Sequence, residues 1–325
     1  MKILPIQQRG LRTSRLVLGC MPFGGGWNRD PITKEDVLNA EKAVDAALAI
    51  GITMFDHADI YGMGKAEETF GAILKNRPDL REQIVIQSKC GIRLGEGSLP
   101  GRFDFSEEHI LQSVDGSLRR LGIEYLDVLL LHRPDPLMEP DGVAEAFGQL
   151  KAAGKVRYFG VSNMSVAQIH FLQRALPEQL AVNQLEMSLA HLHWLDQGVH
   201  VNQAAGVPVN FGEGLMEYCQ METIQLQAWG PLAQGRFSGR SGEAEPDNVR
   251  QTAALVGQMA VEKETTPEAI VLGWLMKHPA LIQPVVGTTN PQRIRACEDA
   301  EQQAQRMTRE EWYTLYVSAR GNPMP

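Results

Sequence analysis

Residues 126–132 read LDVLLLH, and this short run decides the fold class. Apart from Asp127, every side chain before the terminal His132 is aliphatic, so the run lacks the apolar–polar alternation of a strand with one face in water. A strand that is hydrophobic on both faces is typical of a parallel sheet covered by helices. The run therefore predicts a buried parallel strand in an α/β protein.

Short apolar strands and amphipathic helices alternate on both sides of this run, which predicts a parallel sheet. We expect strands at residues 16–20, 53–56, 84–89, 126–132, 157–161, 181–185, 224–229 and 281–286. We expect helices at 34–50, 66–75, 107–120, 142–153, 166–175, 214–220, 249–263, from 267 onward, and at 291–301. Eight strands close a (β/α)8 TIM barrel, whereas an open doubly wound sheet usually has fewer and begins with a glycine-rich phosphate turn.

The whole chain, residues 1–325, is expected to form a single barrel domain, because no linker, repeat or low-complexity run interrupts it. Length alone allows either two average domains or one large barrel, so this conclusion depends on the strand count. Residues 3–14 precede the first strand and are expected to form a small hairpin over the barrel floor. Residues 308–320 follow the eighth unit and predict an extra C-terminal helix.

Composition argues against a nucleic-acid-binding protein and against a membrane-spanning protein. The net charge of −8 gives no basic surface for nucleic acid. No apolar stretch approaches the roughly 20 residues that cross a bilayer, and the N-terminus lacks the apolar core of a secretion signal. The cysteines, at positions 20, 90, 219 and 297, show no metal-binding spacing and predict free thiols in a reducing cytoplasm. We therefore expect a cytoplasmic protein without nucleic-acid or membrane partners.

Polar side chains stand where three neighbouring strands of the expected barrel end. The second strand ends at Asp56 in FDHADIYG (residues 55–62), which places Tyr61 in the following loop. The third ends at Lys89 in IVIQSKCG (residues 84–91), and the fourth ends at His132. Active sites of such barrels lie at the carboxyl ends of the strands, so these side chains are expected to meet at one mouth. Each could have a structural role by itself, but their order and shared position favour a catalytic group.

The chain resembles the aldo-keto reductase superfamily, whose catalytic tetrad is Asp, Tyr, Lys and His in this order. Further shared motifs are VSN at 161–163, NQ at 183–184, AWGPLAQG at 228–235 and GTTNPQR at 287–293. The resemblance covers about residues 16–301, and DHADIYG, SKCGI and HRPDPLM are most similar to a bacterial subgroup of predicted NADP-dependent oxidoreductases. It implies a TIM barrel that reduces an aldehyde or ketone, its small-molecule substrate, to an alcohol.

The tetrad suits this reaction on physical grounds. Hydride transfer puts negative charge on the carbonyl oxygen, so a proton donor and positive charge have to be positioned there. Tyr61 is expected to be the general acid, with the Lys89 ammonium lowering its pKa from the value of about 10 of a free tyrosine. Asp56 would pair with Lys89, and His132 would orient the carbonyl. The hydride has to come from a bound cofactor, because no side chain supplies one.

The resemblance also implies a cofactor site. Ser162, Asn163 and Gln184 are expected to bind the nicotinamide carboxamide, with Trp229 stacked on its ring. Residues 230–235 are expected to cover the pyrophosphate. The full set of implied cofactor contacts is Gly19, Cys20, Met21, Ser162, Asn163, Gln184, Trp229, Gly230, Pro231, Leu232, Gln234, Gly235, Gly287, Thr288, Thr289 and Arg293.

The choice of cofactor depends mainly on Arg293, which matches the family's arginine for the adenosine 2′-phosphate. Thr288 and Thr289 precede a helix N-terminus, where an anion is favoured. These residues favour NADP(H). NAD(H) remains an alternative, because Gly287 and Cys297 stand where some relatives have a phosphate-binding lysine and an adenine-contacting asparagine.

Two other function classes stay open at this stage. A metal-dependent barrel hydrolase or isomerase could use Asp56, His57, Asp59 and His132, but alternation along a strand would point Asp56 and His57 to opposite faces. No metal site is therefore expected. The second class is a redox-sensing regulatory subunit that binds NADPH with little turnover.

The sequence offers two candidate walls for the substrate pocket. Trp27 in CMPFGGGWN (residues 20–28) and the long stretch 188–211 are candidate walls, because long loops at this end of a barrel usually shape binding. The assembly is expected to be a monomer or a weak homo-oligomer.

Overall fold

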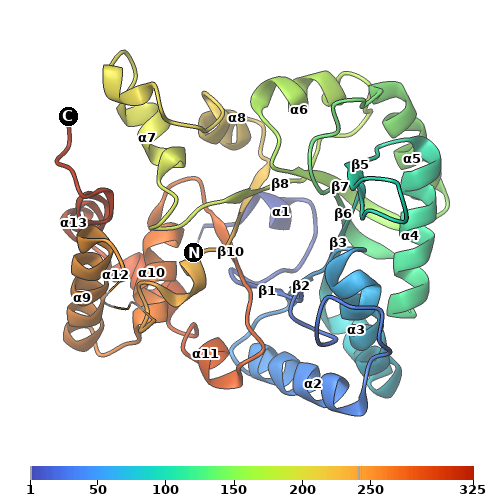
Figure 1. The fold of residues 1–325 in the computed structure, drawn as a ribbon, viewed down its shortest axis with the longest axis horizontal. Coiled ribbons are helices and arrows are strands. Elements are labelled where there is room, and N and C mark those ends of the chain that lie inside the picture. Colours follow the sequence, from blue (N-terminus) through green and yellow to red (C-terminus); the bar gives the residue numbers. More distant parts are fainter. Residues whose placement is uncertain (1, 241, 243) are drawn as a thin grey trace.

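The computed structural model describes residues 2–240, 242 and 244–325, and it shows a closed barrel of parallel strands surrounded by helices (Figure 1). The order around the ring is β1-β10-β9-β8-β7-β6-β3-β2. The barrel strands are β1 (Val17–Gly19), β2 (Met54–Asp56), β3 (Val85–Cys90), β6 (Leu126–Leu131), β7 (Val156–Ser162), β8 (Val182–Glu186), β9 (Gln225–Trp229) and β10 (Gln283–Val286). The predicted (β/α)8 barrel is confirmed.

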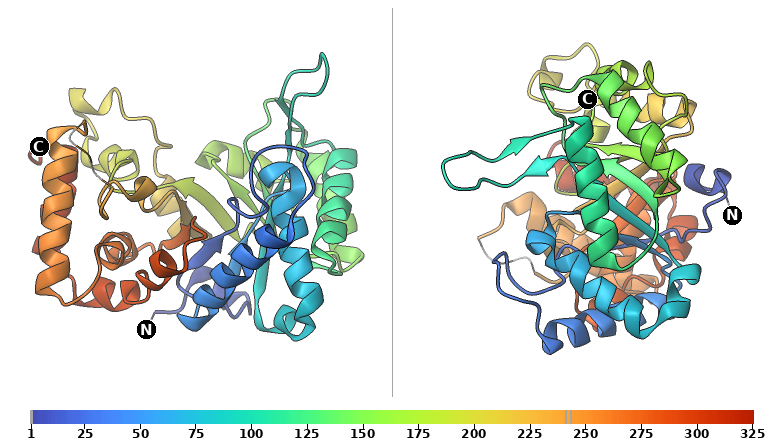
Figure 2. Two further views of the ribbon diagram at one scale, coloured as in Figure 1. Left: turned by 60° about the horizontal axis from the view of Figure 1, so that its bottom comes forward. Right: turned by 90° about the vertical axis from the view of Figure 1, so that its right-hand side faces the viewer.

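Helices cover the outside of the barrel (Figure 2). They are α2 (Lys34–Ala49), α3 (Lys65–Asn76), α4 (Glu107–Leu121), α5 (Pro140–Ala152), α6 (Val166–Gln173), α7 (His193–Val199), α8 (Leu215–Met221), α9 (Asp247–Glu262), α10 (Pro267–Lys277), α11 (Pro291–Arg295), α12 (Ala300–Arg306) and α13 (Arg309–Arg320). Ser106 and Thr266 cap α4 and α10, because each side-chain oxygen accepts a hydrogen bond from a backbone amide of the first turn. The extra C-terminal helix is α13, as predicted. No helix in the described ranges is long and apolar enough to cross a membrane.

Strand β6 shows why the decisive run is apolar at every strand position except Asp127. Val128 and Leu130 belong to the small cluster inside the barrel, while Leu129 and Leu131 belong to the larger cluster between the strands and the helices. Successive side chains of a strand point to opposite faces, so both faces of β6 are buried. This is the environment that the sequence predicts.

The expected N-terminal hairpin is wrong. Residues 2–14 contain no strand, and helix α1 (Pro5–Gln8) lies in their place. Pro5 suits the first position of a helix and lacks the amide that a strand partner needs. The Gln7 side chain accepts a hydrogen bond from the Leu4 amide at 2.9 Å and so closes this turn. Leu4 and Ile6 are buried with the interior cluster, so the segment does close the barrel floor, but as a helical turn.

Further elements differ from the sequence prediction, and one of them is α7, a helix within the stretch 188–211 that was expected to be a loop. Strands β4 (Ile92–Arg93) and β5 (Arg102–Phe103) form an unpredicted antiparallel hairpin that projects from the barrel after β3 (Figure 2). The helix expected at 291–301 is divided into α11 and α12. Helix α12 packs closely on α10, where a Cβ at Gly273 would lie 2.9 Å from Gln303 Cβ.

Candidate active site

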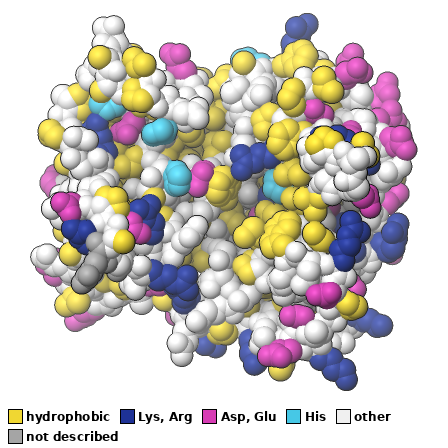
Figure 3. Space-filling model, viewed as in Figure 1, with side chains coloured by type: hydrophobic (Ala, Val, Ile, Leu, Met, Phe, Trp, Pro, Cys, Tyr) yellow, Lys and Arg dark blue, Asp and Glu magenta, His cyan; other side chains and the backbone are white. Residues whose placement is uncertain are grey.

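A pocket of about 460 Å³ opens at the carboxyl ends of the barrel strands. In the space-filling view, the face turned to the reader is hollowed near its centre, where hydrophobic, basic and histidine side chains meet (Figure 3). This volume is within the range of roughly 300–1,000 Å³ that is typical of small-molecule sites. The lining residues are Gly19, Met21, Asp56, Tyr61, His132, Arg133, Ser162, Asn163, Gln184, Trp229, Gly230, Pro231, Leu232, Gln234, Gly235, Arg240, Val285, Val286, Gly287, Thr288 and Arg293.

Asp56, Lys89 and Tyr61 form a hydrogen-bonded chain at this pocket. Lys89 Nζ donates to Asp56 Oδ2 at 2.6 Å and to Tyr61 Oη at 3.1 Å. The register of β2 and β3 pairs Asp56 with Gln87, so Lys89, two residues further along β3, points to the same interior face. Asp56 and Tyr61 line the pocket, and Lys89 is 1% exposed beneath them. The structure thus brings three of the four expected catalytic residues into direct contact.

A tight loop after β2 carries Tyr61 to this position. Tyr61 begins a 3-10 turn that ends at Gly64, where α3 starts. Gly62 and Gly64 have φ values of 57° and 94°, a backbone conformation that glycine adopts without steric cost. Gly62 and Gly64 thus favour the turn that directs the phenol back over the barrel.

Burial and the Lys89 ammonium act on the pKa of the Tyr61 phenol in opposite directions. Burial raises the pKa of Tyr61, and the Lys89 ammonium offsets only part of that rise. We expected Lys89 to bring the pKa of Tyr61 below its ordinary value. The ammonium does act in that direction, but the desolvation of the phenol is the larger effect, so the pKa is raised. Burial by itself would lower the pKa of Lys89, but Asp56 and Tyr61 raise it above its usual value. At neutral pH the site holds a neutral phenol beside an ammonium.

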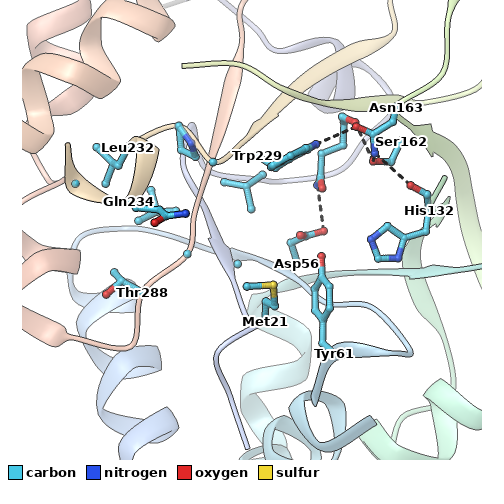
Figure 4. Close-up of a pocket in the computed structure, with 18 of the residues that line it drawn as sticks. Met21, Asp56, Tyr61, His132, Ser162, Asn163, Trp229, Leu232, Gln234 and Thr288 are labelled. Atoms are coloured by element: carbon cyan, nitrogen blue, oxygen red, sulfur yellow. Dashed lines mark hydrogen bonds between the residues drawn. The ribbon is translucent and has the colours of Figure 1, made fainter. Parts of the chain in front are cut away.

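His132 completes the group as a neutral imidazole. Burial, together with the positive charges of Lys89 and Arg133, lowers the pKa of His132 to about 2. Its ring meets the Tyr61 ring edge-on, with 5.7 Å between the ring centroids (Figure 4). His132 Nδ1 is buried without a hydrogen-bond partner within the described part of the chain. A neutral imidazole carries one N–H donor, which is what a carbonyl oxygen requires.

A network of glutamine amides inside the barrel holds Asp56 from the other side. Gln87 Nε2 donates to Asp56 Oδ1 at 2.6 Å, and Gln184 Nε2 donates to the same oxygen at 3.2 Å. Both amides also donate to Gln227 Oε1, and Gln227 in turn donates to Gln283 Oε1 at 3.0 Å. These hydrogen bonds hold the Asp56 carboxylate in place inside the barrel. Sequence reasoning missed Gln87, Gln227 and Gln283, although isolated glutamines within otherwise apolar strands were a visible signal.

The expected nicotinamide contacts also lie together on the pocket wall. Ser162 Oγ accepts from Asn163 Nδ2 at 2.8 Å, and Asn163 Oδ1 accepts from Trp229 Nε1 at 3.1 Å (Figure 4). Asn163 Nδ2 also contacts the His132 carbonyl oxygen at 3.3 Å. Gln184 lines the same wall, but its amide nitrogen is directed to Asp56 and Gln227. The wall offers the amide and hydroxyl groups that a carboxamide needs as partners.

The opposite end of the pocket is basic. A Cβ at Gly235 would lie 2.7 Å from Arg293 Nη2 and 3.1 Å from Arg240 Cδ, so both arginines border this glycine. No atom lies within 4 Å of a Cβ built at Gly287, which leaves the backbone there open to a ligand. Glu268 lies 3.5 Å from Arg293 Nη2. Guanidinium groups beside open backbone fit phosphate groups. Sequence reasoning missed Arg240, because a loop arginine follows no periodic pattern.

Several expected residues do not line the pocket. Cys20 is fully buried, and its amide donates to the Asp56 carbonyl at 2.8 Å, so its role in the structure is to join β1 to the end of β2. Thr289 is not among the lining residues, although Thr288 is. Trp27 is 50% exposed, and neither Trp27 nor any residue of 188–211 lines the pocket. Arg133, Val285 and Val286 line it and were not predicted.

His57 points away from the site, as alternation along the strand predicts. Its ring packs against Phe70 of α3, with 4.7 Å between the ring centroids. Burial lowers the pKa of His57 to about 3, so it is a neutral residue of the core between β2 and α3. Within residues 2–240, 242 and 244–325, no three His, Cys, Asp or Glu side chains are grouped so that they could hold a metal ion.

The parallel barrel and the hydrogen-bonded group Asp56, Lys89 and Tyr61 at its mouth are features of barrel oxidoreductases. The chain belongs to the aldo/keto reductase family, whose model matches residues 15–315. It is 39% identical to an uncharacterized oxidoreductase of Bacillus subtilis, YcsN, over 85% of this chain and 86% of the relative. It is 35% identical to the 6-dehydroglucose reductase of Agrobacterium fabrum over 96% of both chains. A solved thermostable aldo-keto reductase has a TM-score of 0.74 at 22% identity and covers 98% of both chains. The chain is thus an oxidoreductase of a family that uses nicotinamide cofactors.

Proposed function

We propose that this chain is an NADP(H)-dependent reductase that converts an aldehyde or ketone to an alcohol, with Tyr61 as the general acid. The observation that carries the proposal is the position of Lys89 Nζ, which lies 2.6 Å from Asp56 Oδ2 and 3.1 Å from Tyr61 Oη. This arrangement sets a neutral phenol and a fixed positive charge beside a pocket of sufficient size for a ligand. Those are the two features that a developing alkoxide requires.

Each side chain has one task in the reaction. The nicotinamide, when bound, supplies a hydride to the carbonyl carbon. Tyr61 donates its phenolic proton to the carbonyl oxygen, which completes the alcohol and leaves a phenolate. The Lys89 ammonium stabilises that phenolate, and Asp56 keeps the ammonium charged and in place. His132, as a neutral donor, binds the carbonyl oxygen and orients the substrate.

The residues of this chain favour NADPH over NADH. Arg240 and Arg293 both line the pocket and both border Gly235. They follow β9 and β10, which lie on the side of the ring opposite β6. Two guanidinium groups are suited to hold a further phosphate, which NADPH has and NADH lacks. Asn163, Ser162 and Trp229 would hold the nicotinamide end. We also propose that the 325 residues act as one barrel domain, as a cytoplasmic monomer or weak homo-oligomer.

The test is NADPH oxidation against a panel of aldehydes and ketones, with the parent chain and with Tyr61→Phe. Loss of a general acid lowers kcat by about a hundredfold or more. Tyr313→Phe, in α13 outside the pocket, is the matched control and should retain the parent rate. Equal rates for the parent and Tyr61→Phe would refute the assigned acid. Tight NADPH binding without turnover of any carbonyl would instead favour the regulatory role.

A further inference from the structure

Arg133 lies beside the candidate catalytic group without a task in the reaction described above. It directly follows His132, is half-buried and lines the pocket. Its guanidinium carbon lies 5.7 Å from the centroid of the Trp229 ring. In the described part of the chain, no hydrogen bond or ion pair links its guanidinium to another protein group.

The described residues that line the pocket offer Arg133 no free counter-ion: the carboxylate of Glu186, which borders Gly230, lies 3.0 Å from His191 Nε2. Among the described residues that line the pocket, Asp56 is the only carboxylate, and its oxygens are occupied by Lys89, Gln87 and Gln184. The nearby Asp135 accepts hydrogen bonds from the Phe105 and Leu137 amides instead. A charge that is partly withdrawn from water without a partner is costly, so an unpaired guanidinium in a pocket favours an anionic ligand.

The ring order separates Arg133 from the basic end of the pocket. Arg133 follows β6, whereas Arg293 follows β10, and these strands stand at opposite positions of the closed ring β1-β10-β9-β8-β7-β6-β3-β2. Arg240 follows β9, which neighbours β10. A cofactor whose phosphates lie at Arg240 and Arg293 therefore leaves Arg133 free. An anionic group bound at Arg133 would therefore belong to the substrate and not to the cofactor phosphates.

We propose that Arg133 binds an anionic oxygen group of the substrate, so that the preferred substrates are aldehydes or ketones that carry a carboxylate or a phosphate. This inference rests on the proposed reductase function and names its substrate class. A planar guanidinium can donate two parallel hydrogen bonds to either anion. The carbonyl of such a substrate lies at Tyr61 and His132, which line the same pocket.

The test compares matched pairs of substrates. Para-carboxybenzaldehyde and para-nitrobenzaldehyde have similar shape, but only the first is anionic; glyceraldehyde phosphate and glyceraldehyde form the phosphate pair. We expect the parent chain to favour the anionic member of at least one pair. In Arg133→Gln, the ratio of kcat/KM between the anionic and neutral members should fall about tenfold to a hundredfold, the effect of one lost charge-assisted hydrogen bond.

Two controls separate recognition from structure. Arg133→Lys keeps the cation and should recover part of the ratio, while Arg119→Gln, an exposed arginine of α4, should leave the ratio within twofold of the parent. Raising the salt concentration should raise KM for the anionic aldehyde alone, because salt screens the attraction. If Arg133→Gln lowers kcat/KM equally for both members of each pair, Arg133 only supports Trp229 and the proposal is refuted.

A binding experiment keeps this inference distinct from the proposed reaction. Para-(hydroxymethyl)benzoate, the alcohol product of the anionic aldehyde, is titrated calorimetrically into the parent and Arg133→Gln chains, with and without NADPH. Binding that weakens at least tenfold in Arg133→Gln supports the anion site even if no carbonyl is reduced. Equal binding to both chains overturns the anion site even if reduction is observed.

Discussion

Gln87→Leu tests how the interior of the barrel supports the site. The replacement removes an amide and retains most of the side-chain volume. Gln87 is fully buried, and its Nε2 donates to Asp56 Oδ1 at 2.6 Å and to Gln227 Oε1 at 2.8 Å. We expect a modest loss of stability and a separate effect of similar size on catalysis.

The magnitude follows from these contacts. A hydrogen bond to a charged group contributes about 1.5–3 kcal/mol and one to a neutral group about 0.5–1.5 kcal/mol. Gln87 Oε1, however, is buried without a partner in the described structure, and removing such an acceptor returns about 1–3 kcal/mol. The free energy of unfolding should therefore fall by about 1–2 kcal/mol. Because Asp56 loses a bond that fixes it against Lys89, kcat should fall about tenfold, which corresponds to about 1.4 kcal/mol.

The assay combines urea unfolding with steady-state NADPH oxidation, and Gln225→Leu is the control. Gln225 is also fully buried with an unpartnered Oε1 among the described residues, but its Nε2 donates to the Leu281 carbonyl at 2.9 Å and not to Asp56. It should show a similar loss of stability with kcat within twofold of the parent. If the two variants lose the same fraction of kcat, the glutamine network is structural and the reasoning fails.

Two further perturbations address the cofactor and the pH dependence of stability. Arg293→Ala should raise KM for NADPH far more than KM for NADH, measured against Arg295→Ala as an exposed neighbour; equal changes for both cofactors would contradict the phosphate assignment. Burial, with the nearby Glu67, raises the pKa of Asp59 from 3.8 to about 7. The folded chain thus holds this proton more tightly than the unfolded chain, so stability falls as pH rises from about 4 to about 7. Asp59→Asn should flatten that part of the urea-unfolding profile, and an unchanged slope would exclude Asp59 as its source.

The sequence predicts well those elements whose own residues determine whether a face is buried or where a helix begins. The run at 126–132 has to be buried on both faces because it offers no polar face, and it forms β6. Ser106 and Thr266 provide side-chain oxygens for the first amides of their helices, so both starts are predictable within one or two residues. Asp56 and Lys89 stand at or near strand ends, and the barrel brings strand ends together.

What the sequence does not predict depends on contacts between distant segments. The raised pKa of Tyr61 follows from the desolvation of its hydroxyl group beside Lys89 and Asp56, which no local pattern reveals. In the sequence, Gln227 is only a polar residue within an apolar strand. The structure shows that its Oε1 accepts a hydrogen bond from Gln87 Nε2. Arg133 and Arg240 lie after strands, in segments without periodicity, so only the closed ring shows that they share a pocket.

The distribution of charge explains how a chain of net charge −8 could accept two anionic ligands. Charges separated by more than about 8 Å are largely screened at physiological ionic strength, so the acidic exterior has little influence inside the pocket. Among the described residues that line the pocket are three arginines and one carboxylate, and Lys89 neutralises that carboxylate at 2.6 Å. Because β6 and β10 stand opposite each other, the arginines lie at two ends of the pocket. Cofactor phosphates at one end and a substrate anion at the other would hold the reacting carbon between them, beside Tyr61 and His132. On this reasoning, the ring order of the barrel sets the orientation of the substrate.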